Sequence, residues 1–182
     1  MIPELGQLAL VLALLVATVQ GVVPLVGAAR RDATLMAFAR PAAITQFALV
    51  ALAFGCLAAS FLLSDFSVAN VAQNSFSALP PQYKLAASWG SHEGSLLLWA
   101  LMLGGWSCAV ALRSKSLPAP MLARVLAVMG LVAVGFLLCL LLTSNPFERV
   151  FPAPPDGNGL NPILQDPGLA IHPPFLYLGY VG

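Results

Sequence analysis

The sequence predicts an all-α, polytopic membrane protein with four transmembrane helices, the start of a fifth, and two long loops on the outer side. Hydrophobic residues make up 59% of the 182 residues and charged residues only 8%. Ordinary soluble domains carry about a quarter charged residues. So few charges cannot cover a water-soluble globule of this length, so we expect the chain to lie in a lipid bilayer.

Four apolar runs reach the length of about 20 residues that crosses a bilayer. They cover residues 5–28, 42–63, 94–112 and 122–143. No charge lies in their interiors, and backbone groups in lipid must be satisfied within the segment, so each is predicted to be a helix. The first run lacks a basic start and exceeds the core of a signal peptide, so it is predicted to be a retained span.

Glycines recur inside the third and fourth runs, at Gly104, Gly105, Gly130 and Gly135. Small residues allow the backbones of neighbouring membrane helices to approach closely. We therefore expect these glycines to serve helix–helix packing.

The basic residues divide unevenly between the connections. Those on the two short connections are Arg30, Arg31, Arg40, Arg113, Lys115 and Arg124. Only Lys84 and Arg149 fall on the two long connections, which carry most of the acids. The positive-inside rule then places the short connections in the cytoplasm, and the N-terminus and both long loops outside.

The two long outer loops cover residues 64–93 and 144–171. A short interfacial helix is predicted within residues 82–89, after a Pro-Pro break. The second loop is rich in proline and glycine, which excludes regular helix. Its apolar side chains predict that it packs onto other parts of the protein; they are Phe147, Val150, Phe151, Leu160, Ile163 and Leu164.

A fifth span is predicted to begin at Pro174. Residues 174–182 make about two and a half turns, too few to cross the hydrocarbon core. We therefore expect the chain to be the N-terminal portion of a longer protein or one piece of a split one.

The chain has two histidines, both predicted to lie on the outer side. His92 follows Ser91, a good helix N-cap, and is expected either to hydrogen-bond the helix end or to contact a polar ligand. His172 precedes Pro173 and Pro174, which suit a helix start. A helix N-terminus favours neutral imidazole, the form that binds metal or haem iron.

No other motif points to chemistry, and no catalytic side chain is predicted. The sequence lacks zinc-site spacing, a phosphate-binding loop and a serine-hydrolase elbow. Asp65, Asp156 and Asp166 are expected to be solvated or to cap turns. The net charge of +1 argues against a nucleic-acid partner, which requires a basic face.

Several long strings of the sequence resemble one known family. They are MIPELGQLAL at the start, WGSHEGSLLLW at 89–99, TSNPFERV at 143–150 and LNPILQDPGLAIHPPFLYLGYVG at 160–182. They closely resemble the CcmF/NrfE family of cytochrome c biogenesis haem lyases. The resemblance extends along essentially the whole chain.

The resemblance implies a haem lyase of the bacterial inner membrane that works during cytochrome c maturation. Such a protein takes haem b from the haem chaperone CcmE and attaches it to the CxxCH thiols of apocytochrome c. CcmH- and CcmI-type subunits present the apocytochrome. These partners, together with the lipid bilayer, are expected here.

The resemblance also implies roles for individual residues. His172 falls in the family's HPP motif and is expected to be an axial ligand of the transferred haem. Possible further contacts to the haem are His92, Trp89 and the two outer bases, Lys84 and Arg149, which could meet the propionates. The second outer histidine, the tryptophan-rich segment and the ligands of a resident haem b are absent from this sequence. Residues 1–182 alone are therefore expected to be inactive and not to hold haem stably.

Two other functions compete with this interpretation. A transporter would place ionisable residues inside the spans, where the sequence has none. A purely structural assembly subunit is the second alternative, and unchanged cytochrome c maturation in a His172→Ala variant would favour it.

Overall fold

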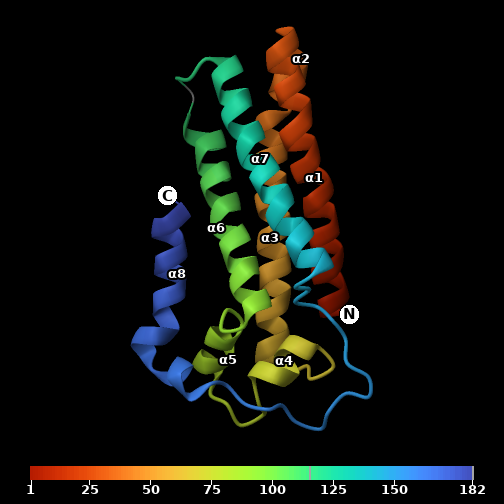
Figure 1. Cartoon of the computed structure of the whole chain (residues 1–182), viewed down its shortest axis with the longest axis vertical. Helices are drawn as coiled ribbons and strands as arrows, with labels where there is room; N and C mark the ends of the chain where they lie inside the picture. The colour runs from red at the N-terminus through yellow and green to blue at the C-terminus, as the bar shows by residue number, and fades with distance from the viewer. Residues whose placement is uncertain (115, 182) are drawn as a thin grey trace.

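The structure is a computed structural model that describes residues 1–114 and 116–181. Four long helices stand side by side as a bundle (Figure 1). They are α1 (Ile2–Arg30), α3 (Ala39–Leu62), α6 (His92–Arg113) and α7 (Ala119–Leu142). Each is long and apolar enough to cross a membrane, and no strand occurs in the described part of the chain. The predicted four-span, all-α fold is therefore confirmed.

Five shorter helices complete the structure. They are α2 (Ala33–Ala37), α4 (Ala69–Asn74), α5 (Pro81–Ala87), the 3-10 helix η1 (Pro162–Gln165) and α8 (Pro167–Val181). Helix α5 matches the short helix predicted within residues 82–89. Helix α4 was not predicted. Helix α8 lies along the flank of the bundle and contacts α6, α5 and η1 (Figure 1).

Helix α1 packs along both α3 and α7 through a stripe of small residues. Its buried positions recur every three or four residues, as one face of a helix requires. They are Pro3, Gly6, Ala9, Leu10, Ala13, Ala17, Gln20, Gly21, Pro24, Gly27 and Ala28. Close packing of small side chains is the main source of helix association where lipid replaces water.

Helices α1 and α7 approach each other closely at Gly21 and Gly130. A Cβ atom on Gly130 would lie 3.0 Å from the backbone nitrogen of Gly21 and 3.1 Å from the carbonyl oxygen of Ala17. The expected packing role is confirmed for Gly130. It is wrong for Gly135, whose Cβ would meet nothing within 4 Å because this glycine lies on the exposed side of α7.

A buried glutamine ties three of the long helices together. Gln20 of α1 is 1% exposed, and its Nε2 donates to the carbonyl oxygen of Leu126 in α7 at 2.9 Å. The same nitrogen donates to the hydroxyl of Ser107 in α6 at 3.1 Å. The amide nitrogen of this buried side chain thus finds two acceptors, whereas its oxygen Oε1 has no hydrogen-bond partner among the described residues.

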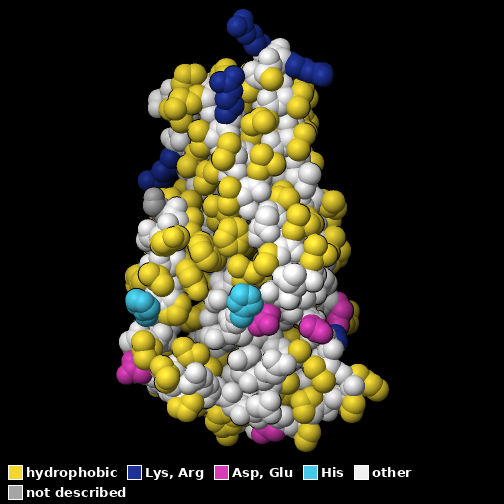
Figure 2. Space-filling view, viewed as in Figure 1, with side chains coloured by type: hydrophobic (Ala, Val, Ile, Leu, Met, Phe, Trp, Pro, Cys, Tyr) yellow, Lys and Arg dark blue, Asp and Glu magenta, His cyan; other side chains and the backbone are white. Residues whose placement is uncertain are grey.

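Charged residues separate to the two ends of the bundle. We call the end that carries Arg30, Arg31, Arg40, Arg113 and Arg124 the basic end; Lys115 lies outside the described residues. The opposite end, with α4, α5 and the second long connection, is the loop end. Figure 2 shows most of the visible basic side chains toward one end, and acidic side chains and both histidines toward the other. This separation agrees with the charge pattern of the sequence.

The two long connections are hydrogen-bonded to each other across the loop end. Backbone nitrogens of Ala69 and Asn158 donate to the carbonyl oxygens of Glu148 and Ala72, both at 2.8 Å. Phe147 and Leu160 are each 5% exposed and belong to the main hydrophobic core. The expectation that this loop packs onto the protein is right for them. It is wrong for Phe151 and Ile163, which are 98% and 63% exposed.

Helix α8 begins at Pro167, seven residues before the predicted start at Pro174. Asp166 explains the earlier start, because its carboxylate accepts from the backbone nitrogens of Gly168 at 2.8 Å and Leu169 at 3.1 Å. Asp166 thus acts as an N-cap, and Pro167 occupies the first helical position, where proline is favoured. Pro173 and Pro174 consequently lie inside the helix.

Candidate functional site

His172 is the sixth residue of α8, and its side chain is exposed. The prediction that it stands at a helix N-terminus is therefore wrong. The dipole of a helix acts mainly within its first turn, which here is residues 167–170. The favouring of neutral imidazole by that dipole does not apply to His172. What remains is an exposed imidazole on a helix at the margin of the bundle.

His172 lies on the side of α8 that faces away from the bundle. Pro167, Ala170 and Ile171 line a groove of about 370 Å³ between α8 and α5. Successive residues of a helix are turned by about 100°, so His172 lies about 200° around α8 from Ala170, the buried residue of this helix, and is on its outward side. Its imidazole is thus available to a ligand that lies outside the four-helix bundle.

Trp89 fixes the first half of α8. Its indole nitrogen donates to the carbonyl oxygen of Ala170 at 2.9 Å, and its ring stacks on Phe54 of α3 with a centroid distance of 6.5 Å. Ala170 is the one buried residue of α8. Trp89, named above as a possible haem contact, lies against the inward side of α8, and His172 lies on the outward side.

Two further tryptophans of α6 hold the second half of α8. Trp99 stacks on Tyr177 with a centroid distance of 5.5 Å and meets Tyr180 edge-on at 5.9 Å. The indole nitrogen of Trp106 donates to the carbonyl oxygen of Leu178 at 3.4 Å. All three tryptophans of the chain therefore contact α8. These contacts could not be predicted from local patterns, because the partners are far apart along the chain.

His92 opens α6 and is exposed. Ser91 is the predicted N-cap, and its hydroxyl oxygen accepts from the backbone nitrogen of Gly94 at 3.0 Å. His92 precedes Trp99 by seven residues, nearly two helical turns, so it shares the face of α6 that carries Trp99 and Trp106. Figure 2 shows both histidines on the same face of the molecule and at about the same level.

Lys84 lies inside the loop end. It is 9% exposed, and its ammonium donates to the hydroxyl of Ser64 at 2.7 Å and to the carbonyl oxygen of Ser77 at 3.1 Å. The amide and hydroxyl of Ser77 both donate to Asp156 at 2.8 Å. These hydrogen bonds, chiefly the one from the Ser77 hydroxyl, lower the pKa of Asp156. Lys84 is therefore part of the internal bonding between the two loops.

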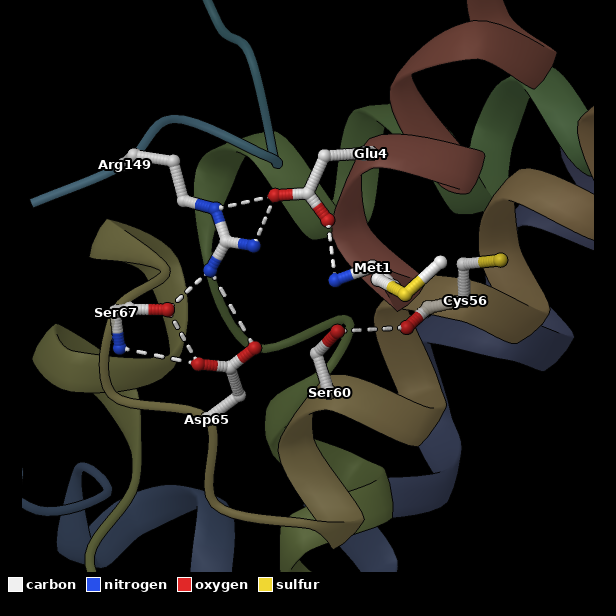
Figure 3. Close-up of polar contacts among 7 residues, drawn as sticks. All are labelled: Met1, Glu4, Cys56, Ser60, Asp65, Ser67 and Arg149. Atoms are coloured by element: carbon white, nitrogen blue, oxygen red, sulfur yellow. Dashed lines mark hydrogen bonds and ion pairs between the residues drawn. The ribbon is translucent and has the colours of Figure 1, made fainter.

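Arg149 joins the second loop to α1 and to the first loop (Figure 3). Its guanidinium pairs with Glu4 and donates to Ser67, and it approaches Asp65 at 3.4 Å. The hydrogen bond to Glu4 raises the pKa of Arg149 above its ordinary value. Helix α8 lies on the other flank of the bundle from the N-terminus (Figure 1). Neither Arg149 nor Lys84 is brought together with His172.

The three carboxylates expected to be solvated or to cap turns all accept hydrogen bonds, and for Asp156 these include donors 79 residues away in the chain. Asp65 accepts from the amide of Ser67 at 3.3 Å, Asp156 binds Ser77, and Asp166 caps α8. Across residues 1–114 and 116–181, no group of three or more His, Cys, Asp or Glu side chains is placed to hold a metal ion. The chemistry that this surface offers is one exposed imidazole, with a second histidine on the same face.

Comparison with known proteins places this arrangement in a family. The family model described as "Cytochrome C assembly protein" matches residues 89–182, more than half of the chain. The cytochrome c-type biogenesis protein CcmF of Pseudomonas aeruginosa is 65% identical over the whole chain, and that of Escherichia coli is 54% identical. The chain spans 28% of the length of both relatives.

A solved structure gives the same result for the fold. The cytochrome c heme lyase CcmF matches with a TM-score of 0.86 and 28% identity, over 100% of this chain and 28% of that one. The residues matched by the family model include α6, α7 and α8, and with them the exposed His172. The chain therefore belongs to the family of cytochrome c assembly proteins.

Proposed function

We propose that this chain forms part of a haem lyase and supplies His172 as an axial ligand to haem while the haem is transferred to apocytochrome c. The observation that carries the proposal is the placement of His172. It is exposed at the loop end, on a helix held in place by three tryptophans, and it faces away from its own bundle. An imidazole in this setting can bind iron without disturbing the packing beneath it.

Haem is the substrate in this proposal, and His172 provides one of its two axial positions. The role of the imidazole is to hold the iron and fix the direction of the porphyrin edge. The bond-forming groups are the vinyl carbons of haem and the cysteine thiols of the CxxCH segment. The second axial ligand comes from outside residues 1–182, so these residues alone are expected not to retain haem.

We further propose that His92 contributes to the same surface. It is exposed, it begins α6, and it lies on the face of α6 that carries the α8-contacting tryptophans. A neutral or protonated imidazole there can donate a hydrogen bond to a haem propionate or to the apocytochrome. His92 is a supporting contact in this proposal, and His172 is the ligand.

The proposed orientation of the protein in the membrane follows from the separation of charges between its two ends. The basic end faces the cytoplasm of a bacterial inner membrane, and the loop end, with both histidines, faces the periplasm. This side is where haem carried by a CcmE-type chaperone and apocytochrome presented by CcmH- or CcmI-type subunits would meet the chain.

The test is a His172→Ala substitution in the intact protein. Covalent haem in a reporter cytochrome c is expected to fall at least tenfold while the level of the variant protein stays normal. His172→Gly should lose activity in the same way and regain part of it when imidazole is added, because free imidazole can occupy the vacated axial position.

Leu176→Ala is the matched control. Leu176 is 49% exposed and lies one turn beyond His172 on the same outward side of α8, so its truncation should leave maturation unchanged. Unchanged maturation in His172→Ala would favour a purely structural subunit over a haem lyase.

A further inference from the structure

We propose that Trp89 is the positioning residue for His172, and that it acts on a carbonyl group that Pro174 leaves without a partner. The inference rests on the proposed role of His172 and adds a residue that sets where this ligand lies. Trp89 is not proposed to touch haem. Its indole binds the backbone of α8 two residues before His172.

Pro174 removes one backbone hydrogen bond from α8. In an α-helix the carbonyl of residue 170 accepts from the backbone nitrogen of residue 174. Pro174 has no N–H, so the carbonyl of Ala170 has no donor within the helix. Ala170 is the buried residue of α8, and leaving a buried carbonyl unpaired is costly.

The side chain of Trp89 supplies a donor to the carbonyl group of Ala170. The indole nitrogen of Trp89 lies 2.9 Å from the oxygen of Ala170. An indole N–H is a donor only, so it suits a lone carbonyl oxygen. The two sides of this hydrogen bond therefore match: Pro174 leaves the acceptor free, and Trp89 supplies a donor.

Trp89 is itself held against the bundle. Its ring stacks on Phe54 of α3 with an interplanar angle of 15°. Its backbone nitrogen donates to the carbonyl oxygen of Ala86 in α5 at 3.2 Å. Trp89 thus fixes the orientation of α8 relative to α3 and α5. His172 lies two residues after the carbonyl group that Trp89 binds.

The test is a double-mutant cycle in the intact protein. Trp89→Phe keeps an aromatic ring for Phe54 but removes the donor. We expect it to lower covalent haem in a reporter cytochrome c about tenfold, the scale of an unpaired buried carbonyl. Pro174→Ala restores a backbone N–H at residue 174. In that background, Trp89→Phe should change haem attachment less than twofold.

A second measurement follows α8 without haem. Hydrogen–deuterium exchange of the peptide that contains residues 167–178 should rise in Trp89→Phe and return toward normal in Trp89→Phe/Pro174→Ala. Equal losses in both backgrounds would overturn the proposal, because Trp89 would then act through ring packing alone. An unchanged Trp89→Phe variant would also overturn it.

These experiments distinguish a failure of the proposed role of Trp89 from a failure of the proposed role of His172. If His172→Ala matures cytochrome c normally, His172 is not the ligand, and the exchange measurement still decides whether Trp89 and Pro174 are coupled. If Trp89→Phe accumulates poorly, recovery of the protein level in the double variant reports the same coupling.

Discussion

Helices α7 and α8 are both apolar, but they are attached to the protein in different ways. Helix α7 buries a residue at nearly every turn and meets α1 at backbone distance through Gly130. Helix α8 buries Ala170 alone and is held by three indole rings. Close packing of its side chains holds α7 in place, whereas a few hydrogen bonds and ring contacts hold α8. A single substitution can therefore move α8 without unfolding the bundle.

The largest difference is expected from truncating one leucine in each helix. Leu137 of α7 is 0% exposed, so Leu137→Ala should lower the free energy of unfolding in detergent by about 2–3 kcal/mol, the cost of a buried cavity. Leu176→Ala in α8 should change it by less than about 0.5 kcal/mol, as surface substitutions do. Equal losses in a thermal or denaturant titration would remove the distinction between the two helices.

A second comparison uses two glycines of α7. Gly130→Ala should destabilise by about 1 kcal/mol, because the added methyl group would lie 3.0 Å from the α1 backbone. Gly135→Ala has open space around its Cβ and should stabilise by about 0.5–1 kcal/mol through helix propensity. The same chemical change thus has opposite signs, and melting temperatures of the two variants in one detergent would show it.

A smaller and more local effect is expected at the start of α8. Asp166→Ala removes the N-cap and should cost about 1 kcal/mol, confined to α8. Hydrogen exchange should rise in residues 167–172 and stay unchanged in α7. Asp166→Asn keeps an acceptor oxygen and serves as the control. Exchange that rises throughout the bundle would show that α8 is an integral part of the core.

The smallest effect concerns pH at the loop end. The pKa of Asp156 is held below its ordinary 3.8 by the Ser77 hydroxyl. A carboxylate with a lowered pKa stabilises the fold at higher pH, and the benefit disappears as pH falls below 3.8 through the lowered value. The melting temperature of the native protein should exceed that of Asp156→Asn at pH 7 and converge with it in acid. A constant difference would contradict the ionic role of Asp156.

Much of the fold could be predicted from the sequence because lipid imposes a simple requirement. A run of about 20 apolar residues must be a helix when water is absent. Loop lengths and basic residues then order the helices. The pairing of helices could not be predicted in this way, since Gly130 and Gly135 look alike until the bundle shows which side of α7 faces α1.

The candidate site was less predictable, for two physical reasons. The Pro173–Pro174 pair suggested a helix start, but an Asp166 cap and Pro167 form a stronger one upstream. The indole that donates to the carbonyl group left free by Pro174 belongs to Trp89, which is 81 residues away from Ala170 in the chain. A hydrogen bond of that separation leaves no trace in local sequence patterns.

The order of the contacts along the chain has a consequence for biosynthesis. Trp89, Trp99 and Trp106 all precede α8. As the polypeptide leaves the ribosome from its N-terminus, the receiving surface on α5 and α6 is therefore synthesised before the helix that it receives. The contacts that hold α8 therefore need no segment after it, and the helix can dock, with its histidine, before any later segment of a longer polypeptide is made.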